Sequence, residues 1–311
     1  MVIAFFGTPQ FAVPTLTRLI ESRHVVAGVV TQPDRPRGRG HTVTEAPVKS
    51  LTVAHGIPVV QPTRLGDGGP EATLRAWRLD LGVVAAYGRL IPESLLSIPR
   101  LGMINVHASL LPKYRGAAPV HRAVMAGEHE TGVTIMRVVK ELDAGAMFAT
   151  VTRPIGPDDT SEVVETALAD LGADLLLQVV EQLGAGTALE IPQDAAQATY
   201  APRLTKEEGL INWSLPAQAI HNRVRGLYPW PHAHAFLNGA RLLILRTRPT
   251  AGSSDAKPGS IVAVAREAIH VATGVGGLDI LALQPEGRRS MEVREYLAGH
   301  PVRPGDAFSS A

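Results

Sequence analysis

An amide and an imidazole lie two residues apart in an apolar segment near the middle of the chain. Asn105 and His107 alternate there with Ile104 and Val106, a pattern typical of a strand. Because successive side chains of a strand point to opposite faces, Asn105 and His107 emerge on one face. An amide donor can hold a developing oxyanion and an imidazole can donate a proton, so the pair carries the equipment of acyl transfer.

A carboxylate further along the chain can complete such a site. Asp143 lies in a short turn-like segment, 141–145, that follows the apolar run 131–136. There it can orient the imidazole of His107 and stabilise its charged form. Ser109 also follows His107, but a serine without a base in reach is a poor nucleophile. An isolated Asn-x-His is equally typical of a strand with two satisfied polar residues, so the short pattern alone leaves both interpretations open.

Composition narrows the class of protein and the kinds of site. The chain has 311 residues, of which 45% are hydrophobic and 19% charged, with a formal net charge of +1 and no cysteine. These values are typical of a globular protein and exclude disordered, collagen-like and coiled-coil chains. The lack of cysteine excludes disulfides, thiolate nucleophiles and zinc sites with sulfur ligands. We find no secretory leader and no run of roughly 18 apolar residues, so we expect a soluble, cytoplasmic monomer.

The N-terminal part alternates strand and helix patterns. The compact apolar runs 2–6, 25–30 and 81–86 are typical of strands buried on both faces of a parallel sheet. Segments 11–21 and 71–78 begin where proline-containing turns would start a helix. This alternation predicts a doubly wound, Rossmann-like α/β domain.

A long helix and a linker follow. Leucine and valine recur every three or four residues over 161–183, which predicts a helix that ends at Gly184. The stretch 187–205 carries prolines and no firm periodicity, so it is typical of a linker running over the surface. We therefore expect an α/β domain over 1–188 and a linker over 189–205.

The remaining residues, 206–311, have the pattern of a small β domain. One helix is expected over 216–225, and Asn238–Gly239 is a strong hairpin turn because both positions tolerate positive φ. Further short strands are expected at 260–264, 268–272 and 278–283. Together they predict a small OB-like β-barrel, which carries more basic than acidic side chains.

Two other kinds of site are excluded. Gly7–Thr8 follows the first strand, but the G-x-G-x-x-G spacing of a dinucleotide-binding turn is absent, so we exclude NAD and FAD. His232 and His234 can share a strand face, but no third ligand is evident, so we expect no metal.

Several short segments carry a resemblance to a known family. They are FGTP at 6–9, TQPDRP at 31–36, AYG at 86–88, NVHASLLP at 105–112, RGAAP at 115–119 and ExxTGVT at 128–134. With these segments the chain resembles the folate-dependent formyltransferases, and most closely those that act on initiator tRNA. The resemblance extends to LQPEG at 283–287, and the segment 105–112 is highly specific.

The resemblance implies a reaction and its catalytic residues. The family's Asn, His and Asp fall on Asn105, His107 and Asp143. The formyl group of the cosubstrate 10-formyltetrahydrofolate is expected to pass to the free α-amino group of methionine esterified to initiator tRNA, giving N-formylmethionyl-tRNA for translation initiation. We expect Asn105 and protonated His107 to stabilise the oxyanion, and Asp143 to hold His107 and help remove the amine proton.

The resemblance also implies where the two substrates bind. The folate is expected against a loop and a wall whose apolar character suits a flat heterocycle. The loop comprises Ser109, Leu110, Leu111 and Pro112, and the wall comprises Tyr87, Leu90, Ile91 and Pro92. A basic segment is expected to approach the tRNA acceptor end through Arg39, with Arg35 and Arg37 beside it and with Arg223 and Arg288 of the barrel as further phosphate contacts.

Two other functions stay open. An enzyme that formylates an amino sugar attached to a nucleotide would use the same folate and the same catalytic residues, although the arginine segment and the basic second domain favour tRNA. A catalytically silent RNA-binding protein could share the scaffold, but the presence of Asn105, His107 and Asp143 argues against it.

Overall fold

The computed structural model describes residues 1–37, 42–66, 69–251 and 255–309. The chain packs as two compact units. Unit 1 comprises residues 1–119, 130–154 and 165–202, and unit 2 comprises residues 120–129, 155–164 and 203–311. Two segments that precede the expected linker therefore pack with the C-terminal residues.

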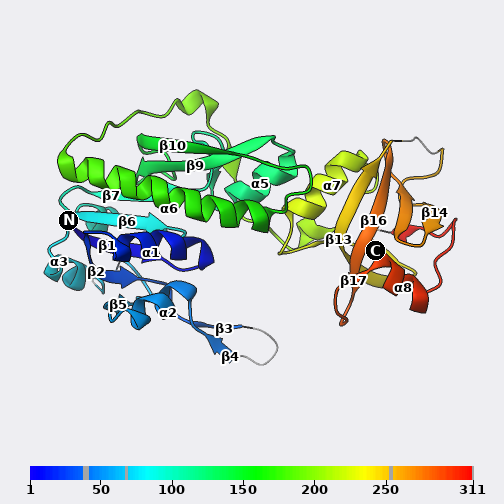
Figure 1. Cartoon of the computed structure of the whole chain (residues 1–311), viewed down its shortest axis with the longest axis horizontal. Helices are drawn as coiled ribbons and strands as arrows, with labels where there is room; N and C mark the ends of the chain where they lie inside the picture. The colour runs from blue at the N-terminus through cyan, green and yellow to red at the C-terminus, as the bar shows by residue number, and fades with distance from the viewer. Residues whose placement is uncertain (38–41, 67–68, 252–254, 310–311) are drawn as a thin grey trace. The chain divides into compact units, whose positions relative to one another are not determined.

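Unit 1 is built on a mixed sheet (Figure 1). In spatial order its strands are β10 (Met147–Pro154), β9 (Glu130–Arg137), β7 (Met103–His107), β6 (Leu81–Ala85), β1 (Val2–Gly7), β2 (Val25–Val30) and β5 (Val59–Val60). The strands expected over 2–6, 25–30 and 81–86 are confirmed as β1, β2 and β6, which pair in parallel.

Two strands at one edge depart from the expected parallel order. β9 is antiparallel to both β7 and β10. Because residues 138–146 are too few for a crossover connection, β9 and β10 can only pair antiparallel. The Rossmann-like α/β class is confirmed, with a mixed rather than wholly parallel sheet.

Helices connect and cover these strands. They are η1 (Gln10–Ala12), α1 (Val13–Glu21), α2 (Pro47–Ala54), α3 (Glu71–Ala76), α4 (Glu93–Leu96) and the greater part of α6 (Ser161–Ala185). Arg18 of α1 donates to Asp174 of α6 over 2.7 Å, so α1 and α6 lie side by side, as Figure 1 shows. Among the described residues, none of the helices combines the length and apolar character needed to cross a membrane.

The burial of the central strands explains why their sequences are apolar without alternation. Ile3, Ala4, Phe5 and Phe6 of β1 have no exposed surface, and every residue of β6 is buried. A strand covered on both faces needs apolar residues at every position, which is why these runs show no polar alternation.

Two short pairings involve segments expected to be irregular. β3 (Arg35–Arg37) pairs antiparallel with β4 (Thr42–Thr44), and residues 38–41 between them lie outside the described residues. β8 (Arg115–Gly116) pairs in parallel with β11 (Tyr200–Ala201), which follows η2 (Ala195–Gln197). The stretch expected to be a surface linker is therefore bonded to the segment that follows His107.

Unit 2 contains an antiparallel sheet with the path β14–β15–β16–β13–β12–β18, and β17 pairs with β16. Its elements are α5 (Pro119–Ala126, from residue 120), η3 (Glu207–Gly209), α7 (Ala217–Gly226), β12 (Ala233–Leu237), β13 (Ala240–Thr250), β14 (Ile261–Ala265), β15 (Ala268–Ala272), β16 (Gly277–Pro285), β17 (Met291–Glu292), α8 (Val293–Gly299) and β18 (Phe308–Ser309). Backbone bonds from Ile261 to Asp306 and from Phe308 to Gly259 join its two edges. The expected barrel-like second domain is confirmed.

The hairpin turn of unit 2 forms as the sequence predicts. Asn238 and Gly239 connect β12 to β13 with φ of 50° and 78°, and Leu237 pairs directly with Ala240. A two-residue turn with both φ positive matches the right-handed twist of the strands, so these two residue types fix the register of the hairpin.

Asp80 secures the start of β1. The Val2 N–H donates to Asp80 Oδ2 over 2.8 Å, and Arg100 Nη2 lies 3.2 Å from Asp80 Oδ1. The hydrogen bond from Val2, together with Arg100, lowers the pKa of Asp80 below its ordinary value. A carboxyl with a lowered folded pKa stabilises the fold above its unfolded pKa of about 3.9 and loses that contribution as the pH falls through the folded pKa.

We predict that Asp80→Asn lowers the free energy of urea unfolding by about 1–2 kcal/mol at neutral pH, because a charge-assisted hydrogen bond is weakened. The difference from wild type should shrink as the pH is lowered through about 4 towards 2, where the wild-type carboxyl is itself protonated. Circular dichroism at a series of pH values measures it. A difference that stays constant over this range would contradict the role given to the carboxylate.

Candidate active site

The segment that holds Asn105 and His107 is a strand, as predicted, in the middle of the unit 1 sheet. Asn105 of β7 is in register with Val84 of β6 and Met136 of β9, and His107 is in register with Thr134 of β9. Hydrogen-bonded neighbours on both sides fix the backbone of β7. His107 ends this strand, and the carboxyl ends of strands are where open α/β sheets bind their ligands.

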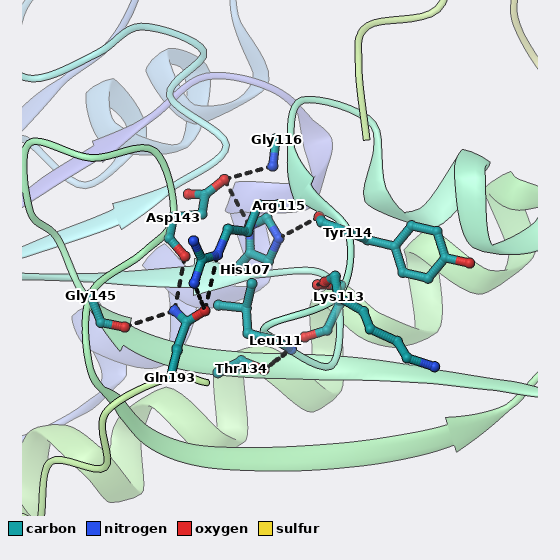
Figure 2. Close-up of polar contacts among 11 residues, drawn as sticks. His107, Leu111, Lys113, Tyr114, Arg115, Gly116, Thr134, Asp143, Gly145 and Gln193 are labelled. Atoms are coloured by element: carbon teal, nitrogen blue, oxygen red, sulfur yellow. Dashed lines mark hydrogen bonds and ion pairs between the residues drawn. The ribbon is translucent and has the colours of Figure 1, made fainter. Parts of the chain in front are cut away.

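His107 is buried and has an oxygen near each ring nitrogen (Figure 2). Its Nε2 lies 3.0 Å from the backbone O of Tyr114, which is a hydrogen-bond distance. Its Nδ1 lies 3.7 Å from Asp143 Oδ2, which is an ion-pair distance. Since carbonyl and carboxylate oxygens only accept, the imidazolium is the form that offers a proton to both.

Asp143 is held in an uncommon backbone conformation. Its φ is 48°, in the left-handed region that aspartate tolerates better than most residues. The same Oδ2 that faces His107 accepts the N–H of Gly116 over 2.8 Å. Gly116 has φ of 122°, and a Cβ there would lie 2.7 Å from the backbone O of Ala201, so glycine is required for this approach. The structure places the Asp143 carboxylate beside the His107 imidazole, where the sequence predicted that it would lie.

Asn105 lies two residues before His107, and its half-buried side chain is bonded to neither His107 nor Asp143. The structure records no side-chain hydrogen bond from Asn105 to any residue that it describes. Its amide is therefore not used by the fold within the described part of the chain, and it remains available to a ligand.

The loop after His107 is fixed by a chain of hydrogen bonds. The buried Ser109 hydroxyl donates to Lys113 O over 2.6 Å, while Ser109 O accepts from the Thr134 hydroxyl over 2.7 Å. The Leu111 N–H donates in turn to Thr134 Oγ1 over 3.1 Å. Ser109 therefore shapes the loop Ser109–Pro112, and its hydroxyl is engaged with a carbonyl rather than with a base.

A cavity of about 630 Å³ opens in unit 1 beside the predicted folate wall. It is lined by Thr63, Arg64, Leu65, Gly66, Arg89, Leu90, Ile91, Pro92, Glu93 and Lys140. Three of the predicted wall residues, Leu90, Ile91 and Pro92, are among them. The predicted loop, Ser109–Pro112, does not line this cavity.

Tyr87 lies in the apolar cluster that backs this cavity. It is 2% exposed and packs edge-on against Phe6, with ring centroids 5.7 Å apart, in the same cluster as Leu65 and Ile91. Burial raises the pKa of Tyr87. Its hydroxyl has no hydrogen-bond partner among the described residues. Tyr87 does not line the cavity, so its hydroxyl lies within the cluster behind the cavity wall.

The arginines predicted to contact tRNA have different surroundings. Arg35 and Arg37 lie on β3, and Arg39 lies outside the described residues. Arg223 of α7 is half-buried, burial lowers its pKa, and its Nε donates to Glu208 O over 2.9 Å. Arg288 is exposed in the turn between β16 and β17.

The two histidines considered as a metal pair both lie in surroundings that disfavour the charged imidazolium. His234 is buried on β12, and burial lowers the pKa of both His232 and His234, with Arg241 adding to the effect on His234. Across the part of the chain that the structure describes, no three His, Asp or Glu side chains gather as a metal site would require.

Three residues of the site were missed at the sequence level. Tyr114 contributes only its backbone oxygen, which no residue type reveals. Arg115 and Gln193 meet at the loop that carries Asp143, where Arg115 Nη2 donates to Gln193 Oε1 over 2.7 Å. Arg115 is part of a segment that carries the family resemblance, which is a signal that could have found it. Gln193 lies in the expected linker and carries no such signal.

Two profiles of known protein families match the chain. One is described as "Formyl transferase" and matches residues 1–180, and the other, "Formyl transferase, C-terminal domain", matches residues 203–301. The chain belongs to the formyl transferase family. The family predicted from the short segments is thereby confirmed.

Curated relatives within this formyl transferase family are similar over nearly the whole chain. The methionyl-tRNA formyltransferase of Methylobacillus flagellatus is 47% identical over 311 residues, which is 100% of both chains. The methionyl-tRNA formyltransferase of Moorella thermoacetica is 46% identical over 306 residues, which is 98% of both.

Solved structures share the fold at lower identity. An N-formyltransferase from Helicobacter canadensis, in complex with folinic acid and dTDP-3-aminofucose, aligns with a TM-score of 0.68 and 16% identity over 90% of this chain and 99% of its own. HypX from Aquifex aeolicus, in complex with tetrahydrofolic acid, aligns with a TM-score of 0.65 and 20% identity over 95% of this chain. This chain spans 46% of the HypX chain, about half of its length.

Gly145 gives a test of how tightly the Asp143 loop is packed. A Cβ at this position would lie 1.9 Å from the backbone O of Arg137. We predict that Gly145→Ala lowers the free energy of unfolding by about 1–3 kcal/mol, the usual cost of overpacking. The control is Gly299→Ala on α8, where an added Cβ meets nothing within 4 Å and stability should be unchanged or slightly higher. Equal denaturation midpoints for Gly145→Ala and wild type would contradict the close approach.

Proposed function

We propose that this protein transfers the formyl group of 10-formyltetrahydrofolate to the α-amino group of methionine esterified to initiator tRNA, giving N-formylmethionyl-tRNA for translation initiation. The observation that carries the proposal is 46–47% identity, over essentially the full length, to proteins named methionyl-tRNA formyltransferase. The Helicobacter canadensis enzyme with its nucleotide-linked sugar is 16% identical. Identity at this level supports a shared fold and carries no argument about the acceptor.

His107 stabilises negative charge in the proposed reaction. The cosubstrate supplies the formyl group, and the α-amino nitrogen of methionine forms the new amide bond as the bond to folate N10 breaks. His107 donates from Nε2, whose proton Tyr114 O accepts in the free protein. Asp143, 3.7 Å from Nδ1, stabilises the charged ring, and a fixed charge beside a developing oxyanion lowers the barrier to acyl transfer.

Asn105 and Asp143 complete the proposed proton and charge balance. The Asn105 amide, which has no partner among the described residues, donates to the formyl oxygen as negative charge develops there. The attacking amine loses one proton and folate N10 gains one. Asp143 accepts the amine proton, directly or through water, from its place at the edge of the buried site.

The cavity of unit 1 fits the folate. Its volume of about 630 Å³ lies in the range of small-molecule sites, and Leu65, Leu90, Ile91 and Pro92 give it the apolar walls that a flat heterocycle requires. Tyr87 backs the wall of this cavity through the cluster that also holds Leu65 and Ile91, and its buried hydroxyl does not line the cavity. The loop Ser109–Pro112 does not line this cavity, and we propose that it contacts the part of the folate that extends from the cavity towards His107.

The proposed tRNA contacts divide between the β3–β4 segment and the barrel. Arg35, Arg37 and Arg39 offer guanidinium groups for phosphates or unstacked bases, with Arg39 as the residue that best matches the family. In the barrel, the exposed Arg288 is the better placed of the two candidates, because Arg223 is already engaged with Glu208 O.

The proposal extends to organisation and location. We propose a catalytic domain that binds 10-formyltetrahydrofolate over 1–188, a linker over 189–205 and a tRNA-binding barrel over 206–311, in a cytoplasmic monomer. The two family profiles match 1–180 and 203–301, so the first ends before this linker and the second begins within its last three residues, which supports the division.

The acceptor is tested by offering the purified protein 10-formyltetrahydrofolate with either charged initiator tRNA or a dTDP-linked amino sugar. Transfer to the tRNA alone, weakening as salt rises, is the expected result, because phosphate contacts release counterions. Transfer to the sugar alone would overturn the acceptor and keep the reaction class. Transfer to neither would overturn the proposed reaction and favour a silent RNA-binding protein.

We predict that His107→Ala reduces the turnover number for formyl transfer by at least about 100-fold, because general acid and oxyanion stabilisation are lost together. The matched control is His55→Ala, which removes an exposed histidine at the end of α2 and should leave turnover unchanged. Circular dichroism checks that both variants are folded. Near wild-type turnover by a folded His107→Ala variant would sink the catalytic assignment.

Tyr87→Phe tests the apolar cluster behind the folate cavity. Because the Tyr87 hydroxyl has no partner among the described residues, its removal should leave the free energy of unfolding unchanged or raise it slightly. The KM for 10-formyltetrahydrofolate should stay within about twofold of wild type, because the hydroxyl is shielded from solvent and Tyr87 does not line the cavity. Tyr296→Phe, at a buried tyrosine of unit 2, is the control. A KM raised about fivefold or more by Tyr87→Phe would show instead that the folate contacts this hydroxyl.

A further inference from the structure

Gln193 joins two segments of the active site from the expected linker. Its Oε1 accepts from Arg115 Nε and Nη2 over 3.1 and 2.7 Å. Its Nε2 donates to the backbone oxygens of Asp143 and Gly145, each over 2.8 Å. Figure 2 shows these bonds on the side of Asp143 that faces away from Gly116. One side chain thus ties the loop that carries Asp143 to the segment that follows His107.

The chemistry of its partners fixes the orientation of the Gln193 amide. The Arg115 guanidinium only donates, so it must face the amide oxygen, and backbone carbonyls only accept, so they must face the amide nitrogen. Arg115 is 7% exposed, and both nitrogen donors it directs at Gln193 are used. The amide is therefore locked in one orientation in a partly buried place, where such bonds are strong.

Asp143 needs this support because its backbone is strained. A non-glycine residue with φ of 48° persists only where its surroundings hold it. Gln193 satisfies the carbonyl of Asp143, and Gly116 N–H satisfies its carboxylate. Without the bonds from Gln193, the loop 141–145 would be free to relax and move the carboxylate away from His107.

The same stretch of chain also holds the second acceptor of His107. Thr199 Oγ1 accepts the N–H of Tyr114 over 2.9 Å, and Thr199 O accepts the N–H of Arg115 over 2.8 Å. Tyr114 O is the atom that accepts from His107 Nε2. Both oxygens beside the imidazole are thus placed by residues 193–199.

We propose that Gln193 is a positioning residue for the His107–Asp143 pair, with its amide fixed by Arg115 and its nitrogen holding the loop that carries Asp143. This inference rests on the proposed catalytic roles of His107 and Asp143. The stretch expected to be a passive connector then forms part of the active site.

The test compares Gln193→Ala and Gln193→Glu with the control Gln197→Ala. A glutamate keeps an acceptor for Arg115 but loses both donors, so it isolates the bonds to Asp143 and Gly145. Gln197 belongs to the same stretch, but among the described residues its side-chain amide bonds only Asp194, within that stretch. We expect both Gln193 variants to lower the turnover number by about 10–100-fold at nearly unchanged KM for either substrate, and Gln197→Ala to stay within about twofold of wild type.

A double-mutant cycle separates positioning from a general structural role. In an Asp143→Asn background, Gln193→Ala should cost no more than about a further twofold, because a residue that acts through Asp143 has little left to support. A full additional loss in that background would overturn the proposal, and so would wild-type turnover by Gln193→Ala alone.

Amide hydrogen exchange gives a readout that does not depend on the reaction. Gly116 N–H donates to Asp143 Oδ2, so Gln193→Glu should speed its exchange at least about tenfold while Gln197→Ala leaves it unchanged. Faster exchange in a protein that formylates no acceptor would support the positioning role and contradict the proposed function instead. Unchanged exchange of Gly116 in the Gln193→Glu variant would overturn the positioning role.

Discussion

The candidate active site of unit 1 depends on one arrangement, in which the His107 imidazole is held between two oxygen acceptors. His107 has Tyr114 O at 3.0 Å from Nε2 and Asp143 Oδ2 at 3.7 Å from Nδ1. One acceptor, Tyr114 O, lies in the loop that leaves β7 after His107, and the other, Asp143 Oδ2, lies in the separate loop 141–145. Keeping three segments in register to a few tenths of an ångström requires a rigid strand below the ring and cross-links between the loops.

The sheet and the hydrogen bonds of its edge supply that rigidity. β7 lies between a parallel and an antiparallel neighbour, so its backbone is bonded on both sides. The antiparallel β9 brings Thr134 opposite His107, where its hydroxyl bonds the backbone at both Ser109 and Leu111. The direction of β9 therefore shapes the loop that follows the histidine, and a wholly parallel sheet would have put another residue there.

The sequence predicted those features of the fold that are determined by residues close together in the chain. The buried runs of β1, β2 and β6 and the turn Asn238–Gly239 follow from local composition. The family resemblance assigned His107 and Asp143 together although 35 residues lie between them. Strand direction at β9 could not be read from an apolar run, because parallel and antiparallel strands share that pattern. Tyr114 acts through a backbone atom and Gln193 through a contact with a distant loop, and neither leaves a local signal.

The role of the Asp143 charge is the central claim, and single-turnover formyl transfer to charged initiator tRNA by Asp143→Asn tests it most directly. Asparagine has the same size and keeps an oxygen for the Gly116 N–H, so the variant removes the charge beside His107 and little else. The account predicts a rate at least about 100-fold below that of wild type, in a protein that circular dichroism shows to be folded. A rate within about threefold of wild type would contradict it, because the carboxylate would then be a structural anchor for Gly116 and no part of the chemistry.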